Sequence, residues 1–227
     1  GTIDGVPLAG VVEKDGEVYH ILAEDPGSGG TFVPGQPVLL VLDWERRFDH
    51  MQRHCGEHIL SGIFFREYGG VNRGFHMGDE YMTIDISLET GSAGGETFEA
   101  VDLDMALHAE LEANRVSWRN LPVTTRRFDN KDDAAGIPLR KPLAVDEDIS
   151  IVCVGSPDNP SDCVACCGTH PTTSGQVGLL KIYKVENYKG MFRIYFDAGS
   201  RALEDYRAKH RLILTLGKKF SAGTEDL

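Results

Sequence analysis

The chain has 227 residues, of which 41% are hydrophobic, enough to bury a core in one large domain or two small ones. Its 35 acidic and 23 basic side chains give a formal net charge of −12. That charge argues against a protein that coats long nucleic acid by counterion release, but not against a small basic pocket for one RNA end. No apolar run approaches the ~20 residues that cross a bilayer, and no signal peptide opens the chain. We therefore expect no membrane association.

Four of the five cysteines (Cys153, Cys163, Cys166 and Cys167) crowd into one short segment. A secreted disulfide framework would have an even number of more dispersed cysteines. We therefore expect reduced thiols, a cytoplasmic protein and a metal site. The first residue is Gly1 rather than Met, which suggests a fragment or a processed chain.

Residues 6–42 have the pattern of β structure. Two apolar runs flank Asp15-Gly16, a dipeptide typical of tight hairpin turns because it tolerates positive φ. A second strand pair is expected around Pro34-Gly35. These features predict a small β-barrel or folded sheet over residues 1–45.

The rest of the chain alternates between helical and strand patterns. Apolar residues at three- and four-residue steps predict helices over 48–67 and 97–118, the second with Leu103, Leu107 and Leu111 on one stripe. Strict alternation predicts a half-buried strand over 81–88. The remaining predictions are a loop or short helix over 127–138, a buried strand over 149–154, a hairpin turned at 188–190, and a last helix over 200–216.

These elements predict an α+β fold: a β-barrel-like subdomain at 1–45, a main domain at 46–200 and a C-terminal helix at 201–227. In that helix Leu203, Tyr206, His210 and Ile213 follow a near-heptad step, which suits either core packing or a homodimer seam.

Two short motifs carry the chemistry. In HCGEHIL, His54 and His58 lie four residues apart, so on a helix they share one face and can hold one ion; the plain reading is one core and one solvent-facing histidine. In CVACCGTH, Cys166 and His170 are also four apart. Thiolate and imidazole are good zinc ligands, so the two pairs together predict a tetrahedral N₃S site.

Two other metal sites fit less well. The zincin motif places a glutamate directly after the first histidine, and Cys55 occupies that position here. A cysteine-based site of Cys163, Cys166 and Cys167 with His170 would strain the adjacent pair and leave the His54/His58 spacing unexplained.

At this point the sequence resembles a known family. HCGEHILSGIF looks like the H-x-x-x-H helix of the editing domain of alanyl-tRNA synthetases and of their free-standing AlaX relatives. CCGTHPTTSGQVGLLKI looks like that family's C-x-G-T-H segment, and the flanks over 43–54 and 74–86 agree. The resemblance covers residues from about Gly5 to about Ala202. Threonyl-tRNA synthetase editing domains share the metal motifs, but the lead-in looks like the alanine branch.

The resemblance implies an α/β editing domain with an antiparallel sheet, in which His54, His58, Cys166 and His170 bind one Zn²⁺. It implies hydrolysis of the ester in mischarged tRNA(Ala), chiefly seryl and also glycyl, as a translation-fidelity activity. With no synthetase catalytic domain in these residues, the free-standing form acting in trans is the preferred reading.

Three departures from the family pattern stand out. Cys55 replaces the usual threonine, a glycine-rich segment ahead of GTIDG is missing, and the last helix looks like the start of the C-terminal region of long AlaX forms. We therefore expect an incomplete β-subdomain and a natural protein that extends past Leu227.

The expected catalytic contacts are Thr169, Glu57 and Cys55, with Glu57 also a candidate partner of a histidine; the plain readings are a turn-stabilising threonine and a solvent-facing carboxylate. The expected substrate contacts are Thr83 and His76 at the pocket, with Arg46, Arg47 and Lys181 for the acceptor-end phosphates. Zinc would either activate water or only orient the substrate, because four protein ligands are typical of a closed structural site.

Three other functions stay open. The chain could be a non-catalytic zinc-stabilised module that binds tRNA, an esterase acting on another aminoacyl or acyl ester, or an editing fragment of a larger synthetase-like protein.

Overall fold

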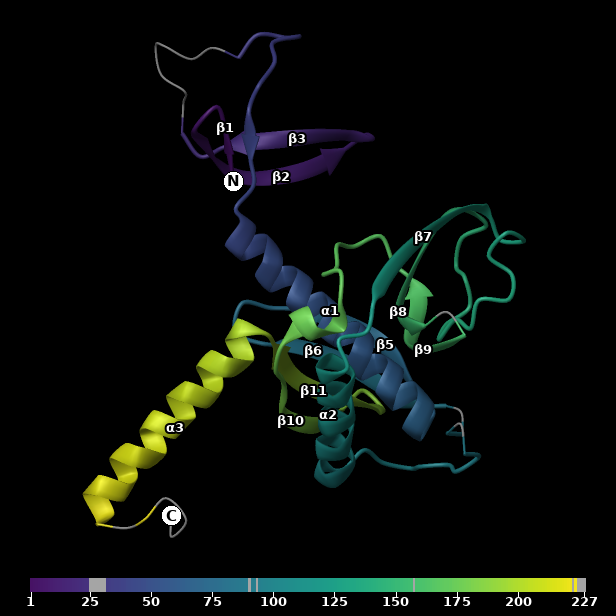
Figure 1. The fold of residues 1–227 in the computed structure, drawn as a ribbon, viewed down its shortest axis with the longest axis vertical. Helices are drawn as coiled ribbons and strands as arrows, with labels where there is room; N and C mark the ends of the chain where they lie inside the picture. Colours follow the sequence, from purple (N-terminus) through teal and green to yellow (C-terminus); the bar gives the residue numbers. More distant parts are fainter. Residues whose placement is uncertain (25–31, 90, 93, 157, 222, 224–227) are drawn as a thin grey trace. The chain divides into compact units, whose positions relative to one another are not determined.

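The computed structural model describes residues 1–24, 32–89, 91–92, 94–156, 158–221 and 223 (Figure 1). The chain divides into two compact units, Gly1–Phe48 and Asp49–Leu227. The domain boundaries expected after residues 45 and 200 stay a prediction. In the described residues no helix is both long and apolar enough to cross a membrane.

The first unit contains a four-stranded antiparallel sheet with the order β3-β2-β1-β4. Its strands are β1 (Thr2–Ile3), β2 (Val6–Lys14), β3 (Glu17–Leu22) and β4 (Leu40–Val41). The predicted hairpin turn lies between β2 and β3, where Asp15 and Gly16 both have positive φ, 54° and 79°. That conformation matches the right-handed twist of the two strands.

The barrel expected for this unit is not seen in its described residues, where the sheet has two separate edges, β3 and β4. Apolar side chains such as Val11 and Val18 are 54% and 60% exposed within the chain, so these strands do not enclose a core. The chain does turn at Pro34-Gly35, where the Gln36 amide donates to the Val33 carbonyl. The strand pair predicted around that turn does not form, because β4 pairs with β1 instead.

The second unit is built on a four-stranded antiparallel sheet with the order β10-β11-β6-β5. Its strands are β5 (Gly70–Met77), β6 (Met82–Leu88), β10 (Leu180–Tyr188) and β11 (Met191–Ala198). Met82, Ile84 and Ile86 point into the main core, and Thr83 and Asp85 lie on the other face. The alternation predicted for this strand is therefore confirmed. The hairpin predicted at 188–190 is also confirmed, with Lys189 and Gly190 both at positive φ.

Two helices, α1 (Trp44–Tyr68) and α2 (Leu103–Trp118), contribute to the core that includes β6, β10 and β11. The face of α2 that packs there is made of alanines, Ala106, Ala109 and Ala113, whereas the predicted leucine stripe points outward. Asn114 fixes the docking, because its amide exchanges two hydrogen bonds of 2.8 and 2.9 Å with the backbone of Leu180. Small side chains let the helix lie close enough for this contact.

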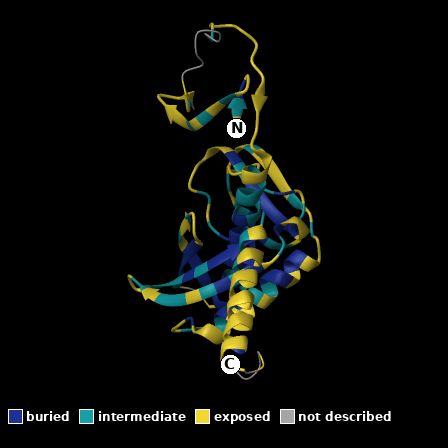
Figure 2. Cartoon of the chain, turned by 90° about the vertical axis from the view of Figure 1, so that its left-hand side faces the viewer, coloured by how far each residue is buried: buried dark blue, intermediate teal, exposed yellow. Residues whose placement is uncertain are grey.

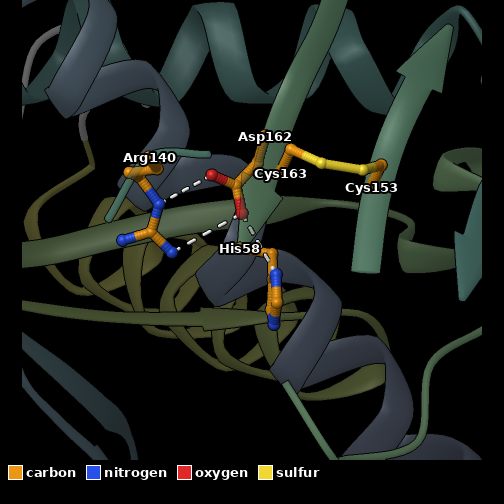
Figure 3. Close-up of a disulfide and its surroundings, with 5 residues drawn as sticks. All are labelled: His58, Arg140, Cys153, Asp162 and Cys163. Carbon is orange, nitrogen blue, oxygen red and sulfur yellow. Dashed lines mark hydrogen bonds and ion pairs between the residues drawn. A yellow bond between two sulfur atoms is a disulfide. The ribbon is translucent and has the colours of Figure 1, made fainter. Parts of the chain in front are cut away.

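A second antiparallel sheet has the order β7-β8-β9, with β7 (Val123–Asn130), β8 (Glu147–Ser156) and β9 (Asn159–Ala165). Cys153 and Cys163 are direct cross-strand neighbours in this sheet and form a disulfide (Figure 3). The expectation that all the thiols are reduced is therefore wrong for this pair. β7 also covers part of the segment expected to be a loop or short helix.

The chain continues through a short 3₁₀ helix, η1 (Ser174–Val177), into β10 and ends with α3 (Ser200–Phe220). Most of α3 is exposed (Figure 2). Leu203 and Tyr206, on the near-heptad stripe, are 41% and 58% exposed within the chain. The stripe is thus not buried as core by the described residues, and the homodimer seam stays a prediction.

Candidate metal centre

The helix α1 presents both histidines of the first motif to β9 and to the loop that follows it. Two glycines in α1 allow neighbouring strands to come close. A Cβ on Gly56 would lie 2.8 Å from the Cβ of Ala198 on β11, and one on Gly62 would lie 2.4 Å from the Ser161 carbonyl oxygen on β9. Both distances are shorter than real Cβ contacts allow, so glycine at these positions sets the spacing of helix and strands.

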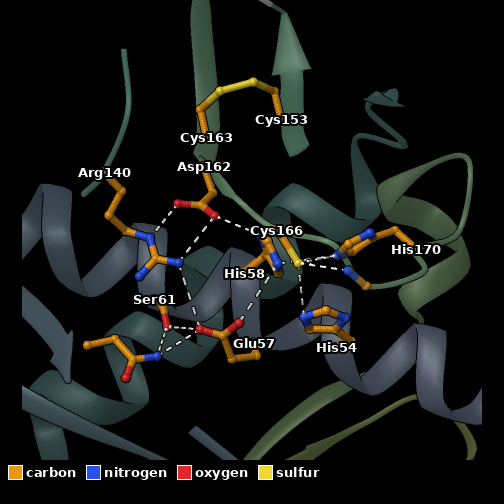
Figure 4. Close-up of polar contacts among 12 residues, drawn as sticks. His54, Glu57, His58, Ser61, Arg140, Cys153, Asp162, Cys163, Cys166 and His170 are labelled. Atoms are coloured by element: carbon orange, nitrogen blue, oxygen red, sulfur yellow. Dashed lines mark hydrogen bonds and ion pairs between the residues drawn. A yellow bond between two sulfur atoms is a disulfide. The ribbon is translucent and has the colours of Figure 1, made fainter. Parts of the chain in front are cut away.

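The loop after β9 carries the second motif to the same place. The Cys166 amide donates to the Ser150 carbonyl of β8, which holds the start of the loop. The donor atoms of His54, His58, Cys166 and His170 all lie within 4.8 Å of one another (Figure 4). Sequence-distant motifs, 112 residues apart, therefore meet in one cluster that can hold a metal ion.

The spacing of the donor atoms suits a tetrahedral ion. His58 Nε2 lies 3.2 Å from His170 Nε2, and Cys166 Sγ lies 3.5 Å from His54 Nε2 and 3.8 Å from His170 Nε2. Zinc bonds of about 2.0–2.3 Å separate neighbouring ligand atoms by roughly 3.3–3.8 Å. The donor set of three imidazoles and one thiol is also one that zinc prefers.

Gly168 gives a second indication that these residues fit a metal ion. A Cβ at this position would lie 2.2 Å from Cε1 and 2.6 Å from Nδ1 of His54. Only a glycine lets the loop pass directly against the imidazole ring, so the glycine in CCGTH is what allows His54 and Cys166 to meet.

The electrostatics favour the metal-binding forms of two cluster residues, Cys166 and His170. Burial raises the pKa of Cys166, but hydrogen bonds with His170, His54 and His58 outweigh it and lower that pKa to about 3. Burial lowers the pKa of His170, which favours its neutral imidazole. A thiolate and a neutral imidazole are the forms that coordinate metal.

Behind His58 lies a buried carboxylate, Asp162, that the sequence reasoning missed. Asp162 Oδ2 is 3.1 Å from His58 Nδ1, and Oδ1 accepts from Arg140 Nε at 2.6 Å (Figure 3). Burial disfavours ionisation, but His58 and Arg140 hold the pKa of Asp162 below its ordinary value. Burial lowers the pKa of His58, yet Asp162, Cys166 and Glu57 together raise it.

Glu57 is buried, at 6% exposed, so it is not the solvent-facing carboxylate of the plain reading. Its Oε1 accepts hydrogen bonds of 2.7 Å from Ser61 Oγ and from Asn72 Nδ2 (Figure 4). Its Oε2 lies 4.0 Å from His58 Nε2. Glu57 therefore belongs to the site but makes no hydrogen bond to His58.

The cluster opens onto a cavity of about 240 Å³. His54, His58 and Cys166 line it together with Glu57 and a set of residues absent from the sequence prediction: Asn72, Arg73, Phe75, Arg140 and Lys141. Arg73 pairs with Glu89, and Arg140 pairs with Asp162. Burial lowers the pKa of Lys141. This volume is below the ~300–1,000 Å³ of pockets for drug-sized ligands, so the cavity suits a small group.

Two of the three predicted catalytic residues lie away from this cavity. Cys55 is fully buried in the main core, and burial raises the pKa of its thiol to about 12. Cys55 is not among the residues that line the cavity, and its catalytic role stays a prediction. Thr169 is exposed on the loop between Cys166 and His170.

None of the predicted substrate contacts in the second compact unit lines the cavity beside the cluster. Thr83 and His76 pair across β5 and β6 and line a separate cavity of about 530 Å³. Lys181 binds the Glu110 carboxylate at 2.8 Å. Arg46 and Arg47 belong to the first compact unit. The alternation of side chains along β5 and β6 explains why Thr83 and His76 do not line this cavity. Phe75 and Ile84 lie on the face of the sheet toward α1, so His76 and Thr83, which are next to them in sequence, lie on the opposite face.

The chain is similar in sequence to known proteins. Residues 149–195 match the family described as the threonyl and alanyl tRNA synthetase second additional domain. The chain is 34% identical over 196 residues to the alanyl-tRNA editing protein AlaX-L of Pyrococcus horikoshii, covering 85% of this chain and 44% of that protein. It is 26% identical over 229 aligned positions to the alanyl-tRNA editing protein Aarsd1 of Danio rerio, covering 100% of this chain and 51% of that protein.

The chain is also 28% identical over 207 residues to the alanine–tRNA ligase of Pyrococcus abyssi, covering 89% of this chain and 21% of the ligase. It spans about half the length of the alanyl-tRNA editing proteins that it matches. The matched segment contains Cys166 and His170 of the cluster, and the longer alignments span most or all of the chain. The chain is therefore similar over most of its length to alanyl-tRNA editing proteins, and residues 149–195 match the threonyl and alanyl tRNA synthetase second additional domain.

Proposed function

We propose that this chain hydrolyses the aminoacyl ester of mischarged tRNA(Ala) in trans, chiefly Ser-tRNA(Ala) and also Gly-tRNA(Ala), with one zinc ion per chain. The observation that carries the proposal is the four-residue cluster opening onto a cavity of about 240 Å³. A structural metal site has no need of such a cavity, whereas an editing site must admit one small aminoacyl group. The relatives named as alanyl-tRNA editing proteins support the choice of substrate.

In this proposal His54, His58, Cys166 and His170 hold the zinc. Bound there, zinc would supply Lewis-acid polarisation of the ester carbonyl or a water of lowered pKa. The protein contributes the charge of the cavity wall, which contains three basic residues, Arg73, Arg140 and Lys141, and one acidic residue, Glu57. Cations in a partly buried wall favour a reaction in which negative charge develops on the carbonyl oxygen, as it does when water attacks an ester.

The choice among amino acids would come from the polar side of the same cavity. Glu57 and Asn72 are 6% and 3% exposed and are hydrogen-bonded to each other. A buried carboxylate or amide that can also form a hydrogen bond with a hydroxyl favours a substrate that has one over a substrate with a methyl group in its place. These residues replace Thr83 as the candidates for recognition of the serine hydroxyl, since Thr83 lies at the other cavity.

The test is deacylation of Ser-tRNA(Ala), Gly-tRNA(Ala) and Ala-tRNA(Ala) by the zinc-loaded and the zinc-stripped chain. We expect zinc-dependent loss of serine with alanine spared, and loss of this activity in His54→Ala. Metal analysis should give one zinc per chain. Equal hydrolysis of all three substrates, or activity unchanged by stripping, would contradict the proposal.

The four protein ligands favour one other function, because a full tetrahedral set is typical of structural zinc. In that case the chain is a zinc-stabilised module that binds tRNA without acting on it. A folded, zinc-loaded sample that binds tRNA(Ala) but deacylates none of the charged forms would establish this alternative.

A further inference from the structure

Asp162 is enclosed between a cluster histidine and a buried arginine. The exposed fractions of His58, Asp162 and Arg140 are 1%, 4% and 7%. A carboxylate at this depth costs several kcal/mol of desolvation unless both oxygens find charged or hydrogen-bonding partners. Both do, because Oδ2 meets His58 Nδ1 at 3.1 Å and Oδ1 accepts from Arg140 Nε at 2.6 Å.

A backbone hydrogen bond also holds Arg140 next to Asp162. The Arg140 amide donates to the carbonyl of Cys163, the residue after Asp162, at 2.8 Å. Arg140 is therefore attached to β9 through its main chain as well as through its guanidinium. On the other side, Gly62 lets α1 approach Ser161 and Asp162 closely enough for His58 to reach the carboxylate.

The contact decides which nitrogen His58 presents to the cluster. With Nδ1 donating to Asp162, the free lone pair of neutral His58 is on Nε2, the atom that lies 3.2 Å from His170 Nε2. Among the described residues, no other cluster histidine has a carboxylate hydrogen-bonded to its second ring nitrogen; His170 Nδ1 is buried without a hydrogen-bond partner. Glu57 does not take this part, because its closest approach to His58 is the 4.0 Å from Oε2 to Nε2.

We propose that Asp162 is a positioning residue of the metal centre, which orients His58 and fixes its ligating nitrogen, and that Arg140 holds Asp162 in place. This inference rests on the proposed function, because it assumes that the cluster binds zinc. A histidine ligand oriented by a buried carboxylate binds more tightly than a free one, and loss of such a partner typically costs 10–100-fold in metal affinity.

The test is the zinc affinity of Asp162→Asn, measured by competition with a chromophoric chelator. Asparagine keeps the shape of the side chain and removes its charge. The matched control is Asp85→Asn, since Asp85 is 8% exposed and pairs with Arg193 at 2.7 and 2.8 Å but contacts no cluster residue. We expect about 10–100-fold weaker zinc binding in Asp162→Asn and unchanged binding in Asp85→Asn.

A second readout separates positioning from a merely structural role. The visible absorption of the Co²⁺-substituted protein reports the geometry of the ligands, so it should change in Asp162→Asn and not in Asp85→Asn. If Asp162→Asn does not fold, Asp162→Asn/Arg140→Met removes both buried charges together and takes its place with the same expectations.

Zinc affinity and Co²⁺ spectrum unchanged in a folded variant, while the unaltered chain binds zinc and deacylates Ser-tRNA(Ala), would overturn this inference alone. Equal losses in Asp162→Asn and Asp85→Asn would also overturn it. An unaltered chain that binds no zinc would overturn the proposed function and this inference together.

Discussion

At the scale of single residues, the metal centre depends on a glycine as well as on its ligands. Gly168 has no Cβ, and the space where one would lie is filled by the His54 ring. Cys166 and His170 are each two residues away from this glycine. The same short loop therefore supplies two ligands and the space for the ring of a third, His54. The electrostatics are equally local, because the thiolate of Cys166 is stabilised by the histidines that surround it.

Gly168→Ala tests this close approach. We expect it to push His54 away and weaken zinc binding by about 5–150-fold, the equivalent of the ~1–3 kcal/mol that an overpacked contact costs. Chelator competition measures the affinity. Gly10→Ala is the control, since a Cβ there has no heavy atom within 4 Å. Equal affinities for the two variants would show that the loop relaxes freely.

The three cysteines outside the disulfide should differ sharply in reactivity. Cys55 is fully buried with a pKa of about 12, so at pH 8 only about one molecule in ten thousand has its thiolate. Cys167 is exposed. We expect iodoacetamide to modify Cys167 in the zinc-loaded protein, Cys166 after zinc is removed, and Cys55 only on unfolding, as read by peptide mass spectrometry. Rapid labelling of Cys55 in the folded chain would contradict its place in the core.

At the scale of elements, α1 is tied to the central sheet by an ion pair as well as by packing. Arg53 Nε donates to Asp197 Oδ1 on β11 at 2.7 Å, and Arg53 Nη2 donates to the Gly78 carbonyl at 2.8 Å. Arg53 and Asp197 are 1% and 0% exposed. Arg53 directly precedes His54, so the pair also sets the position of the helix turn that carries the first ligand.

Arg53→Met should therefore destabilise the fold strongly. It leaves Asp197 buried without its charged partner, and breaking a buried pair in this way costs ~3–5 kcal/mol of unfolding free energy. Urea unfolding followed by circular dichroism gives the value. Arg193→Met, which breaks the more exposed pair with Asp85, should cost less. Equal losses would mean that the Arg53 pair is no better shielded from water than the Arg193 pair.

At the scale of the whole chain, the cluster joins two segments that are more than a hundred residues apart. Two ligands belong to α1 and two to the loop after β9. A ligand that binds only the folded state adds to its stability by mass action, about 2.7 kcal/mol at a concentration of 100 times Kd. A metal ion bound by ligands from both segments should therefore raise the free energy of unfolding of the second unit.

Removal of zinc by a chelator should lower the midpoint of thermal unfolding. Differential scanning calorimetry with and without chelator measures the shift. Cys166→Ala, which lacks one ligand, serves as the control and should respond much less. A shift of the same size in Cys166→Ala, or none in the unaltered chain, would contradict a metal held by these four residues.

The features that could be predicted from the sequence are local ones. The period of α1, the alternation of β6 and the positive-φ turns at Asp15-Gly16 and Lys189-Gly190 follow from neighbours within a few residues, and all four are confirmed. The two motifs of the metal centre were also readable, because each pair of ligands lies within one turn or one short loop. Predictions that no observation here tests, such as the homodimer and the cytoplasmic location, remain predictions.

Which residues surround that centre depends on how distant parts of the chain pack together. β5, β7 and β9 escaped prediction because strands rich in polar residues are defined by their partners rather than by their own pattern. The contact of His58 with Asp162 spans 104 residues and that of Arg140 with Asp162 spans 22, distances over which periodicity has no information. The same holds for Thr83 and His76, because the face of a sheet that meets the site is set by how the helices pack. The pattern of residues along the sequence indicates local secondary structure, whereas contacts between distant residues depend on the path of the backbone.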